Sequence, residues 1–280
     1  MTEQVERARS RDAQAMSSAI RRKVLEQSKR ANLGHIGSAL SIADLLAALL
    51  TGELRGDPDD ADRDRLVLSK GHAVLALYAA LNERGVLSDA QLRSFGGDGS
   101  DLGGHPEHTL AGIDFSTGSL GHGLPIGVGA ALAAKIRRSR RRVFVLMSDA
   151  ENNEGSLWEA AMFAAHHRLS NVVGLVDVNG QQALGHTRDV LDLAPLGDRW
   201  RAFGWDVHEV DGHDVEALRE TVSRLDTEAG PPHVLLAETT FGKGVSFMEG
   251  QVAWHYWPMD DDQYRRAMRE LDAAAGVAAS

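Results

Sequence analysis

Two oxygen-bearing side chains stand at the ends of two apolar segments, and their spacing suits a cation site. Asp149 follows RVFVLMS, and Asn179 follows NVVGLVDV 30 positions later. One strand, one helix and one return strand occupy about this length, so we expect both side chains at the carboxyl edge of a parallel sheet. Mg²⁺ prefers oxygen ligands and often shares carboxylates with phosphates. The pattern is compatible with a magnesium–diphosphate site, with a backbone carbonyl near Gln181 as a third ligand. On these two residues alone, however, simple strand-end capping by Asp149 and Asn179 is the more typical role.

Backbone amides add to the predicted anion site. The turn around Ala150 and the start of the following helix near Gly155 and Ser156 present free N–H groups, which favour a bound phosphate. The glycine-rich stretch 118–129 invites a dinucleotide interpretation, but Gly121, Gly123 and Gly127 do not have the required spacing and no clear strand precedes them. We therefore favour a diphosphate site over a dinucleotide site.

Four histidines stand in short glycine-containing or loop-like segments, where imidazoles are free to exchange protons near neutral pH. They are His35, His72, His105 and His255. Any one of them alone is more typical of a turn or a surface. His166 and His167 differ because they fall inside a predicted helix, and we expect one of that pair to pack against the sheet.

The elements that must position these residues alternate between strands and helices, which predicts a doubly wound α/β fold with a mainly parallel sheet and helices on both faces. Glycines and polar residues dominate 96–123, a long loop that we expect to be functional. The predicted helices are 1–28, 41–50 with Ser41 as N-cap, 74–85, 127–138, 155–169, 193–204 and 214–225, and the predicted strands lie within 64–70, 142–149, 171–179, 205–212 and 233–239.

Composition limits the function classes. The chain has 280 residues, no cysteine and a formal charge of −10, so disulfides and thiolate sites are excluded and nucleic-acid binding is disfavoured. Residues 137–142 include five arginines, which we interpret as a solvated helix end. No segment is long and apolar enough to span a membrane and no signal peptide is evident, so we expect a cytoplasmic protein. We expect one domain over residues 1–280, with 261–280 as a peripheral tail.

The segment SDAENNEGSLWEAA…VDVNGQQ resembles the thiamine-diphosphate motif of transketolases. Four further segments resemble transketolase sequence and follow the family's order: GHIGSALSIADLL, SKGHAVLALYA, GGHPE with STGSLGHGLPIGVGAA, and AETTFGKGVSFMEGQVAWH. The resemblance implies thiamine diphosphate with Mg²⁺ (or Ca²⁺ or Mn²⁺) as cofactors. Ser148 and Ala150 stand where the family has glycines, and Ser119 stands where it usually has proline. The implied metal ligands are Asp149, Asn179 and the Gln181 carbonyl; the implied cofactor contacts are His72, Gly118, Ser119, Leu120, Asp149, Ala150, Glu154, Asn179 and His255; the implied catalytic residues are His35, His72, His105 and Glu154.

The implied activity is transfer of a two-carbon ketol unit from a ketose (phosphate) donor to an aldose acceptor. Nothing after His255 resembles the pyrimidine-binding domain of transketolases, so the resemblance is to split transketolases, in which a second, C-terminal subunit completes an α2β2 heterotetramer. His255 is followed by YWPMD rather than by the usual glycine, which suggests an altered pocket. An acyloin-forming enzyme that uses a modified sugar or an α-keto acid donor, and a non-catalytic structural or regulatory subunit, remain alternatives.

Overall fold

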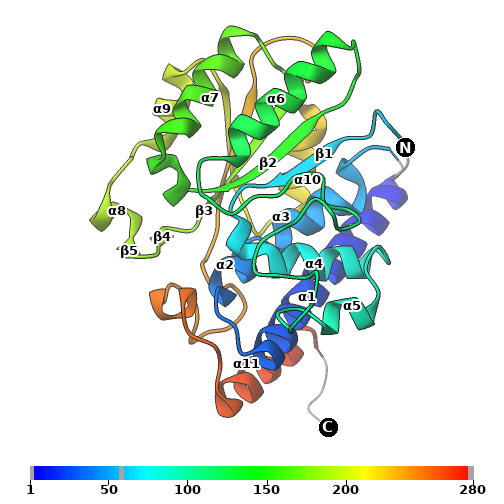
Figure 1. Cartoon of the computed structure of the whole chain (residues 1–280), viewed down its shortest axis with the longest axis vertical. Helices are drawn as coiled ribbons and strands as arrows, with labels where there is room; N and C mark the ends of the chain where they lie inside the picture. The colour runs from blue at the N-terminus through cyan, green and yellow to red at the C-terminus, as the bar shows by residue number, and fades with distance from the viewer. Residues whose placement is uncertain (1–2, 57–59, 277–280) are drawn as a thin grey trace.

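Five parallel strands form the centre of the protein (Figure 1). The computed structural model describes residues 3–56 and 60–276. The strands are β1 (Arg65–Leu68), β2 (Val143–Ser148), β3 (Val172–Val178), β6 (Asp206–Asp211) and β7 (His233–Glu238). Their order across the sheet is β1-β2-β3-β7-β6, and every neighbouring pair is parallel. The predicted α/β fold with a mainly parallel sheet is confirmed.

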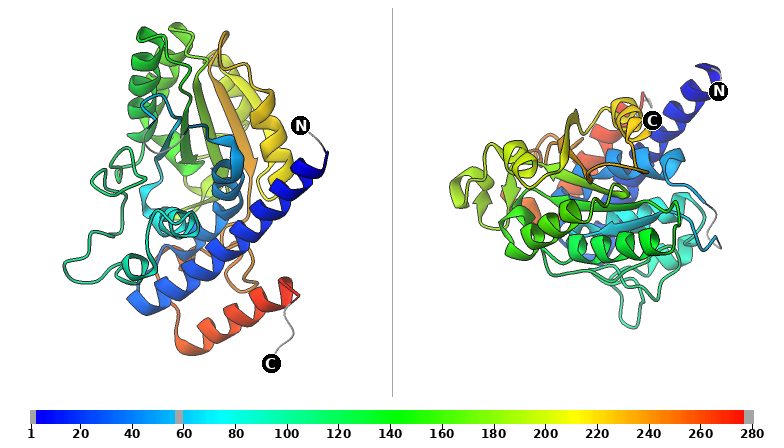
Figure 2. Two further views of the ribbon diagram at one scale, coloured as in Figure 1. Left: turned by 90° about the vertical axis from the view of Figure 1, so that its right-hand side faces the viewer. Right: turned by 90° about the horizontal axis from the view of Figure 1, so that it is seen from above.

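Helices cover both faces of the sheet, and alternate strand residues point to each face (Figure 2). Val143 and Val145 of β2 pack with one group of helices, whereas Phe144 and Leu146 pack with the other. All six residues of β2 are buried, as expected for a central strand of a doubly covered sheet. The first group is α6 (Gly123–Ile136), α7 (Gly155–His166) and α9 (Leu196–Ala202), and the second is α1 (Glu3–Ala31), α2 (Ile36–Ser41), α3 (Ala43–Ala48), α4 (Val74–Glu83) and α10 (Val215–Arg224).

Shorter elements complete the chain. A two-stranded hairpin of β4 (Gln181–Gln182) and β5 (Gly185–His186) projects beyond the carboxyl end of β3. The long loop expected over 96–123 has neither helix nor strand up to residue 122. The remaining elements are a π-helical turn η1 (Leu49–Glu53), 3₁₀ turns η2 (Gly71–Ala73), η3 (Ala150–Asn153) and η4 (Val252–His255), and the helices α5 (Asp89–Arg93), α8 (Thr187–Val190) and α11 (Asp261–Ala274).

Three local predictions were wrong. Ser41 is not a helix N-cap: helical structure already begins at Ile36, and the Ser41 hydroxyl lies 3.0 Å from the Ser38 carbonyl and 2.7 Å from the Asp177 carboxylate. The helix predicted from residue 127 begins earlier, at Gly123. Neither His166 nor His167 packs against the sheet, because both lie at the solvent-facing end of α7. Periodicity located these helices, but tertiary contacts set their ends.

The arginine run after α6 has a structural role at the far end of the sheet from Asp149. Arg142 is buried and pairs with Asp64 through its Nη2 (2.7 Å). Arg140 pairs with Glu228 (2.6 Å) on the surface, and Arg141 donates to the Ala61 carbonyl.

No helix within residues 3–56 and 60–276 is long and apolar enough to cross a membrane.

The C-terminal helix α11 packs along α1, two elements that are far apart in the sequence (Figure 2). Ala267 of α11 is fully buried, and Arg22 of α1 forms an ion pair with Asp272. Glu270 accepts hydrogen bonds from both the backbone N–H (2.5 Å) and the hydroxyl (2.9 Å) of Ser246. The expected tail thus contains a packed helix, while the assignment of residues 1–280 to one domain stays a prediction.

We predict that Ala267→Asp lowers the free energy of unfolding by about 1–3 kcal/mol, because it places a carboxylate in a fully buried contact. Urea denaturation of the full chain measures the change. Arg265→Ala, on the exposed side of the same helix, is the matched control and should leave the midpoint unchanged. Equal midpoints for both variants would show that α11 adds no stability.

Candidate functional site

The carboxyl edge of the sheet brings Asp149 and Asn179 together. They follow β2 and β3, and the last pair of residues that these two strands align with each other is Ser148 and Asp177. The Asp149 carboxylate accepts backbone hydrogen bonds from Ala150 and Gly180, each 2.8 Å long. The Asn179 side-chain oxygen accepts from the Gln181 backbone N–H (3.0 Å). The Asp149 carboxylate therefore reaches the turn that carries Asn179, as the 30-residue spacing predicted.

The electrostatics around Asp149 favour an added cation. Burial, with the nearby Asp177 carboxylate, raises the pKa of Asp149 to about 7. The hydrogen bonds from Ala150 and Gly180 oppose this rise only in part. A divalent cation beside Asp149 would offset both causes, because it interacts favourably with the ionised carboxylate.

A buried ion pair lies beneath this turn. The side chains of Lys70 and Asp177 are completely buried and in contact. The Asp177 carboxylate also accepts hydrogen bonds from Ser41 (2.7 Å), from Asn179 (2.8 Å) and from Thr239. It therefore connects α2, the loop after β1, the end of β3 and the segment that follows β7.

A second buried carboxylate, Glu151 of η3, holds the glycine-rich loop. It accepts a hydrogen bond from the Gly121 backbone N–H (2.7 Å) and another from the Ser69 hydroxyl. Burial raises the pKa of Glu151, although these hydrogen bonds oppose the rise. A side chain at Gly121 would collide with Glu154 and Ser156, since a Cβ there would lie 2.6 Å from each. The loop can approach η3 closely only because glycine occupies this position.

Three of the four selected histidines form a cluster. The ring centroid of His35 lies 5.4 Å from that of His72 and 4.9 Å from that of His255, and the His72–His255 separation is 5.3 Å. His72 Nε2 is 3.0 Å from the Ser38 hydroxyl. The backbone N–H of His35 donates to the His255 carbonyl (3.2 Å), which fixes the segment after η4 against α2.

The cluster favours neutral imidazoles. Burial, assisted by the Lys70 ammonium and the other imidazoles, holds the pKa of His72 well below its usual range. Burial and His35 lower the pKa of His255 to about 4, and burial also lowers the pKa of His35. At neutral pH these rings therefore carry a free lone pair that can accept a hydrogen bond or a proton.

The remaining predicted residues surround this cluster. His105 is exposed and lies against Gly118, where an added Cβ would be 3.4 Å from its ring. Ser119 and Glu154 are exposed, whereas Leu120 is half-buried. Neither Ser148 nor Ala150 has a positive φ, so the backbone conformation around Asp149 does not itself require glycine at these positions.

One cavity of about 160 Å³ joins the histidine cluster to the turn after β3. Two buried acceptors, the side-chain oxygens of Asn153 and Gln181, belong to residues of its wall and have no hydrogen-bond partner. Together with the oxygens of Asp149 and Asn179, these unpaired oxygens fit a hard cation. The wall is formed by Ser38, Lys70, His72, Leu120, Ser148, Ala150, Asn153, Glu154, Asn179, Gln181, Gln182, Ala183 and His255.

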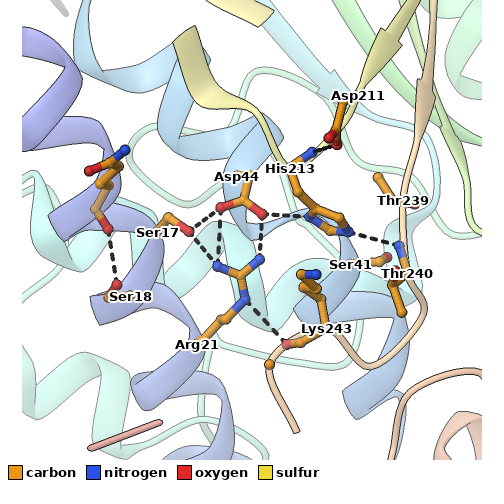
Figure 3. Close-up of polar contacts among 12 residues, drawn as sticks. Ser17, Ser18, Arg21, Ser41, Asp44, Asp211, His213, Thr239, Thr240 and Lys243 are labelled. Carbon is orange, nitrogen blue, oxygen red and sulfur yellow. Dashed lines mark hydrogen bonds and ion pairs between the residues drawn. The ribbon is translucent and has the colours of Figure 1, made fainter. Parts of the chain in front are cut away.

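A second buried network positions the segment that leads from β7 to His255 (Figure 3). Asp44 of α3 accepts hydrogen bonds from Arg21 (2.5 and 3.1 Å) and lies 2.7 Å from His213 Nδ1. His213 Nε2 accepts the backbone N–H of Thr240 (2.8 Å), so its proton must be on Nδ1, facing Asp44. Arg21 Nε donates to the Lys243 carbonyl (3.2 Å). These contacts fix residues 240–243 onto α1 and α3.

Comparison with known proteins identifies the family to which the chain is similar. Residues 12–275 match the family "Transketolase, thiamine diphosphate binding domain". The chain is 43% identical over 254 residues to an apulose-4-phosphate transketolase subunit of Phocaeicola vulgatus (90% of each chain), and 38% identical over 265 residues to the 6-deoxy-6-sulfo-D-fructose transketolase subunit SqwG of a Clostridium species (93% of this chain, 96% of that one). The crystal structure of Campylobacter jejuni transketolase superimposes with a TM-score of 0.87 at 30% identity, over 95% of this chain and 43% of that chain.

The chain therefore belongs to the transketolase family, through its thiamine-diphosphate-binding domain. It is a ketol-transferring transketolase subunit of the split type, similar along nearly its whole length to proteins that are themselves named as single subunits of transketolases. The predicted family, enzyme class and thiamine diphosphate cofactor are confirmed.

Sequence reasoning missed the residues that hold the site from below. Lys70, Glu151 and Asp177 are fully buried, and none was selected. Asp177 carried a usable signal, because it is a charged residue inside the otherwise apolar strand NVVGLVDV. Glu151 lies in a polar run in which composition does not distinguish an inward-facing carboxylate from a solvated one.

We predict that the Asp44 network makes the free energy of unfolding decrease as the pH falls below about 4. Burial acts to raise the pKa of Asp44, but hydrogen bonds from His213 and Arg21 outweigh it and hold this pKa well below its usual value of 3.8. The associated stability is fully present above about pH 4 and is lost as pH falls below it, because the unfolded state then binds the proton first. Urea denaturation between about pH 2.5 and 6 should show a shallower pH slope for Asp44→Asn than for the wild type.

The exposed Asp262→Asn variant is the control for this experiment and should retain the wild-type slope. Parallel pH profiles for all three proteins would contradict the assignment of the low pKa to Asp44.

Proposed function

We propose that the chain binds the diphosphate of thiamine diphosphate, together with a divalent cation, at the carboxyl ends of β2 and β3. Asp149, Asn179 and the Gln181 carbonyl would hold Mg²⁺, for which Ca²⁺ or Mn²⁺ could substitute. The observation that carries the proposal is the convergence of Asp149 and Asn179, through Gly180, beside a cavity whose wall includes His72 and His255. Ala150 and Gly118, Ser119 and Leu120 of the loop would complete the contacts to the cofactor.

Thiamine diphosphate supplies a carbanion-stabilising centre for cleavage and formation of the bond beside a ketose carbonyl. The imidazoles of this chain would handle the protons of that chemistry. His35 and His72 are neutral and adjacent, so they can accept a proton from a sugar hydroxyl or donate a hydrogen bond to a developing oxyanion. His105 lies beside Gly118 of the loop, close enough to the cluster to contribute to the lowered pKa of His35 and of His72, and His255 would face the diphosphate.

The proposed donors are ketoses that carry an anionic group, and the acceptors are aldoses. Two relatives are named for apulose-4-phosphate and for 6-deoxy-6-sulfo-D-fructose, both of which are ketoses with an anionic substituent. These names favour a modified ketose over the ordinary pentose phosphates. An α-keto acid donor is the competing substrate class, which a substrate screen with the assembled enzyme would separate. The expected cytoplasmic location stays a prediction from the sequence.

The rim of the cavity supports the proposal of a second subunit over the site. Leu184 in the β4–β5 hairpin is 80% exposed, and Trp257 after η4 is 66% exposed. Tyr256, 52% exposed, links these segments through a hydrogen bond from its hydroxyl to the Ala183 carbonyl (2.7 Å). Clustered exposed apolar side chains are typical of an interface. We assign this rim to a C-terminal, pyrimidine-binding subunit in an α2β2 assembly, with Glu154 in the relay between its active sites.

We predict that Asp149→Ala abolishes Mg²⁺-dependent binding of thiamine diphosphate, because it removes the buried carboxylate that would hold the cation. Isothermal titration of thiamine diphosphate and Mg²⁺ into this chain mixed with a co-purified or genomically neighbouring second chain is the measurement. The wild-type mixture should show saturable binding that EDTA removes. Unchanged affinity in the variant would refute the metal assignment.

Two controls sharpen this titration. Glu159→Ala, at the surface of α7 and away from the cavity wall, should bind as the wild type does. Wild-type chain without its partner should bind weakly, since half of the proposed site is then missing. If the assembled wild-type complex binds no thiamine diphosphate, the chain is a non-catalytic structural or regulatory subunit.

We predict that Trp257→Ser weakens assembly with the second chain by roughly tenfold or more, as expected for a large aromatic at an interface centre. Sedimentation or light scattering of the mixed chains measures the affinity. The isolated variant should unfold at the wild-type urea concentration, because Trp257 is mostly exposed. Phe163→Ser, an exposed aromatic on α7, is the comparison, and equal losses for both would contradict the assignment to the rim.

A further inference from the structure

Two histidines and one aspartate converge at the amino end of the edge strand, away from the turn that holds Asp149. Asp206 of β6 lies directly opposite His233 of β7 in the parallel register, and His208 is two residues further along β6. The Asp206 Oδ2 atom is 3.3 Å from His208 Nε2 and 3.4 Å from His233 Nδ1. One ligand atom from each of the three residues lies within 4.8 Å of the other two.

Hydrogen bonding fixes the tautomer of His233. Its Nε2 lies 2.9 Å from the Asp226 carbonyl, which can only accept, so Nε2 must carry the proton. In the neutral ring Nδ1 then holds a lone pair, and this atom is buried and has no hydrogen-bond partner. His233 as a whole is only 3% exposed, so bulk water does not solvate it. A backbone carbonyl that orients the far nitrogen is the usual support of a metal-binding histidine.

His208 presents a second unpaired nitrogen to the same point. Its Nε2 is also buried without a hydrogen-bond partner, although the ring is 28% exposed. The lone pair of His233 Nδ1, the Asp206 carboxylate oxygen and His208 Nε2 thus converge on one point. Such unpaired buried atoms are costly unless an ion or water satisfies them.

We propose that Asp206, His208 and His233 bind a divalent transition-metal ion of the zinc class, with solvent completing the coordination. Two imidazoles with one carboxylate suit Zn²⁺, whereas Mg²⁺ prefers an all-oxygen shell, so the site differs in chemistry from that of Asp149. The bound ion would link β6 to β7 and, through the His233–Asp226 hydrogen bond, to the loop after α10. Its role is therefore structural, at the exposed edge of the sheet.

The test is isothermal titration of Zn²⁺ into the full, untagged chain after EDTA treatment and dialysis, without thiamine diphosphate. Wild type should bind one equivalent at this site. His208→Gln and Asp206→Asn should each weaken binding by at least about tenfold, since even loss of a residue that only orients a ligand typically costs this much. Both positions are partly exposed, so these variants should fold.

Matched controls separate this site from others. His167→Gln removes an exposed histidine elsewhere, and Asp149→Ala removes the proposed magnesium ligand; both should bind Zn²⁺ as the wild type does. X-ray absorption of the zinc complex should show two imidazole ligands in the wild type and one in His208→Gln. The proposal is overturned if wild type binds no Zn²⁺, or if His208→Gln and Asp206→Asn bind it as tightly as His167→Gln.

Discussion

The site depends on one carboxylate, that of Asp177. It is completely buried and receives hydrogen bonds from side chains of four different segments, including the fully buried Lys70 ammonium. A charge in this position is tolerated only when it is paired and its oxygens are satisfied. The four segments must therefore meet at one point for the protein to fold. Because Asn179 is one of the donors, the same requirement that stabilises the core also orients a predicted metal ligand.

The carboxyl edge also carries an imbalance of buried charge. Asp149, Glu151 and Asp177 are buried there with Lys70 as their shared cation, and the pKa values of Asp149 and Glu151 are raised. Folding has concentrated negative charge at the point where we propose that a diphosphate binds. An anion can approach such a place only if cations accompany it, so metal and diphosphate are best understood as entering together. The histidine cluster of His35, His72 and His255 lies beside this edge, and its lowered pKa values favour neutral rings that add no positive charge.

The sequence predicted most of this arrangement, for reasons that are physical. The alternation of apolar strands and amphipathic helices determined the parallel sheet, and the strand–helix–strand spacing brought Asp149 and Asn179 to one edge. What could not be predicted depends on contacts across the chain. The local pattern indicates a helix cap at Ser41, yet its hydroxyl serves Asp177, 136 residues away. Spacing alone did not reveal that His255 would join His35 and His72 in one cluster, with His105 beside Gly118.

The exposed apolar rim formed by Leu184, Tyr256 and Trp257 has a consequence for how the protein is made. A chain synthesised in excess of whatever covers this rim would present the same apolar surface to other copies of itself and to chaperones. We expect such orphan chains to be lost to aggregation or degradation. A cell that divides an enzyme between two polypeptides must therefore match their synthesis, and the proposed interface would tie the abundance of one gene product to that of the other.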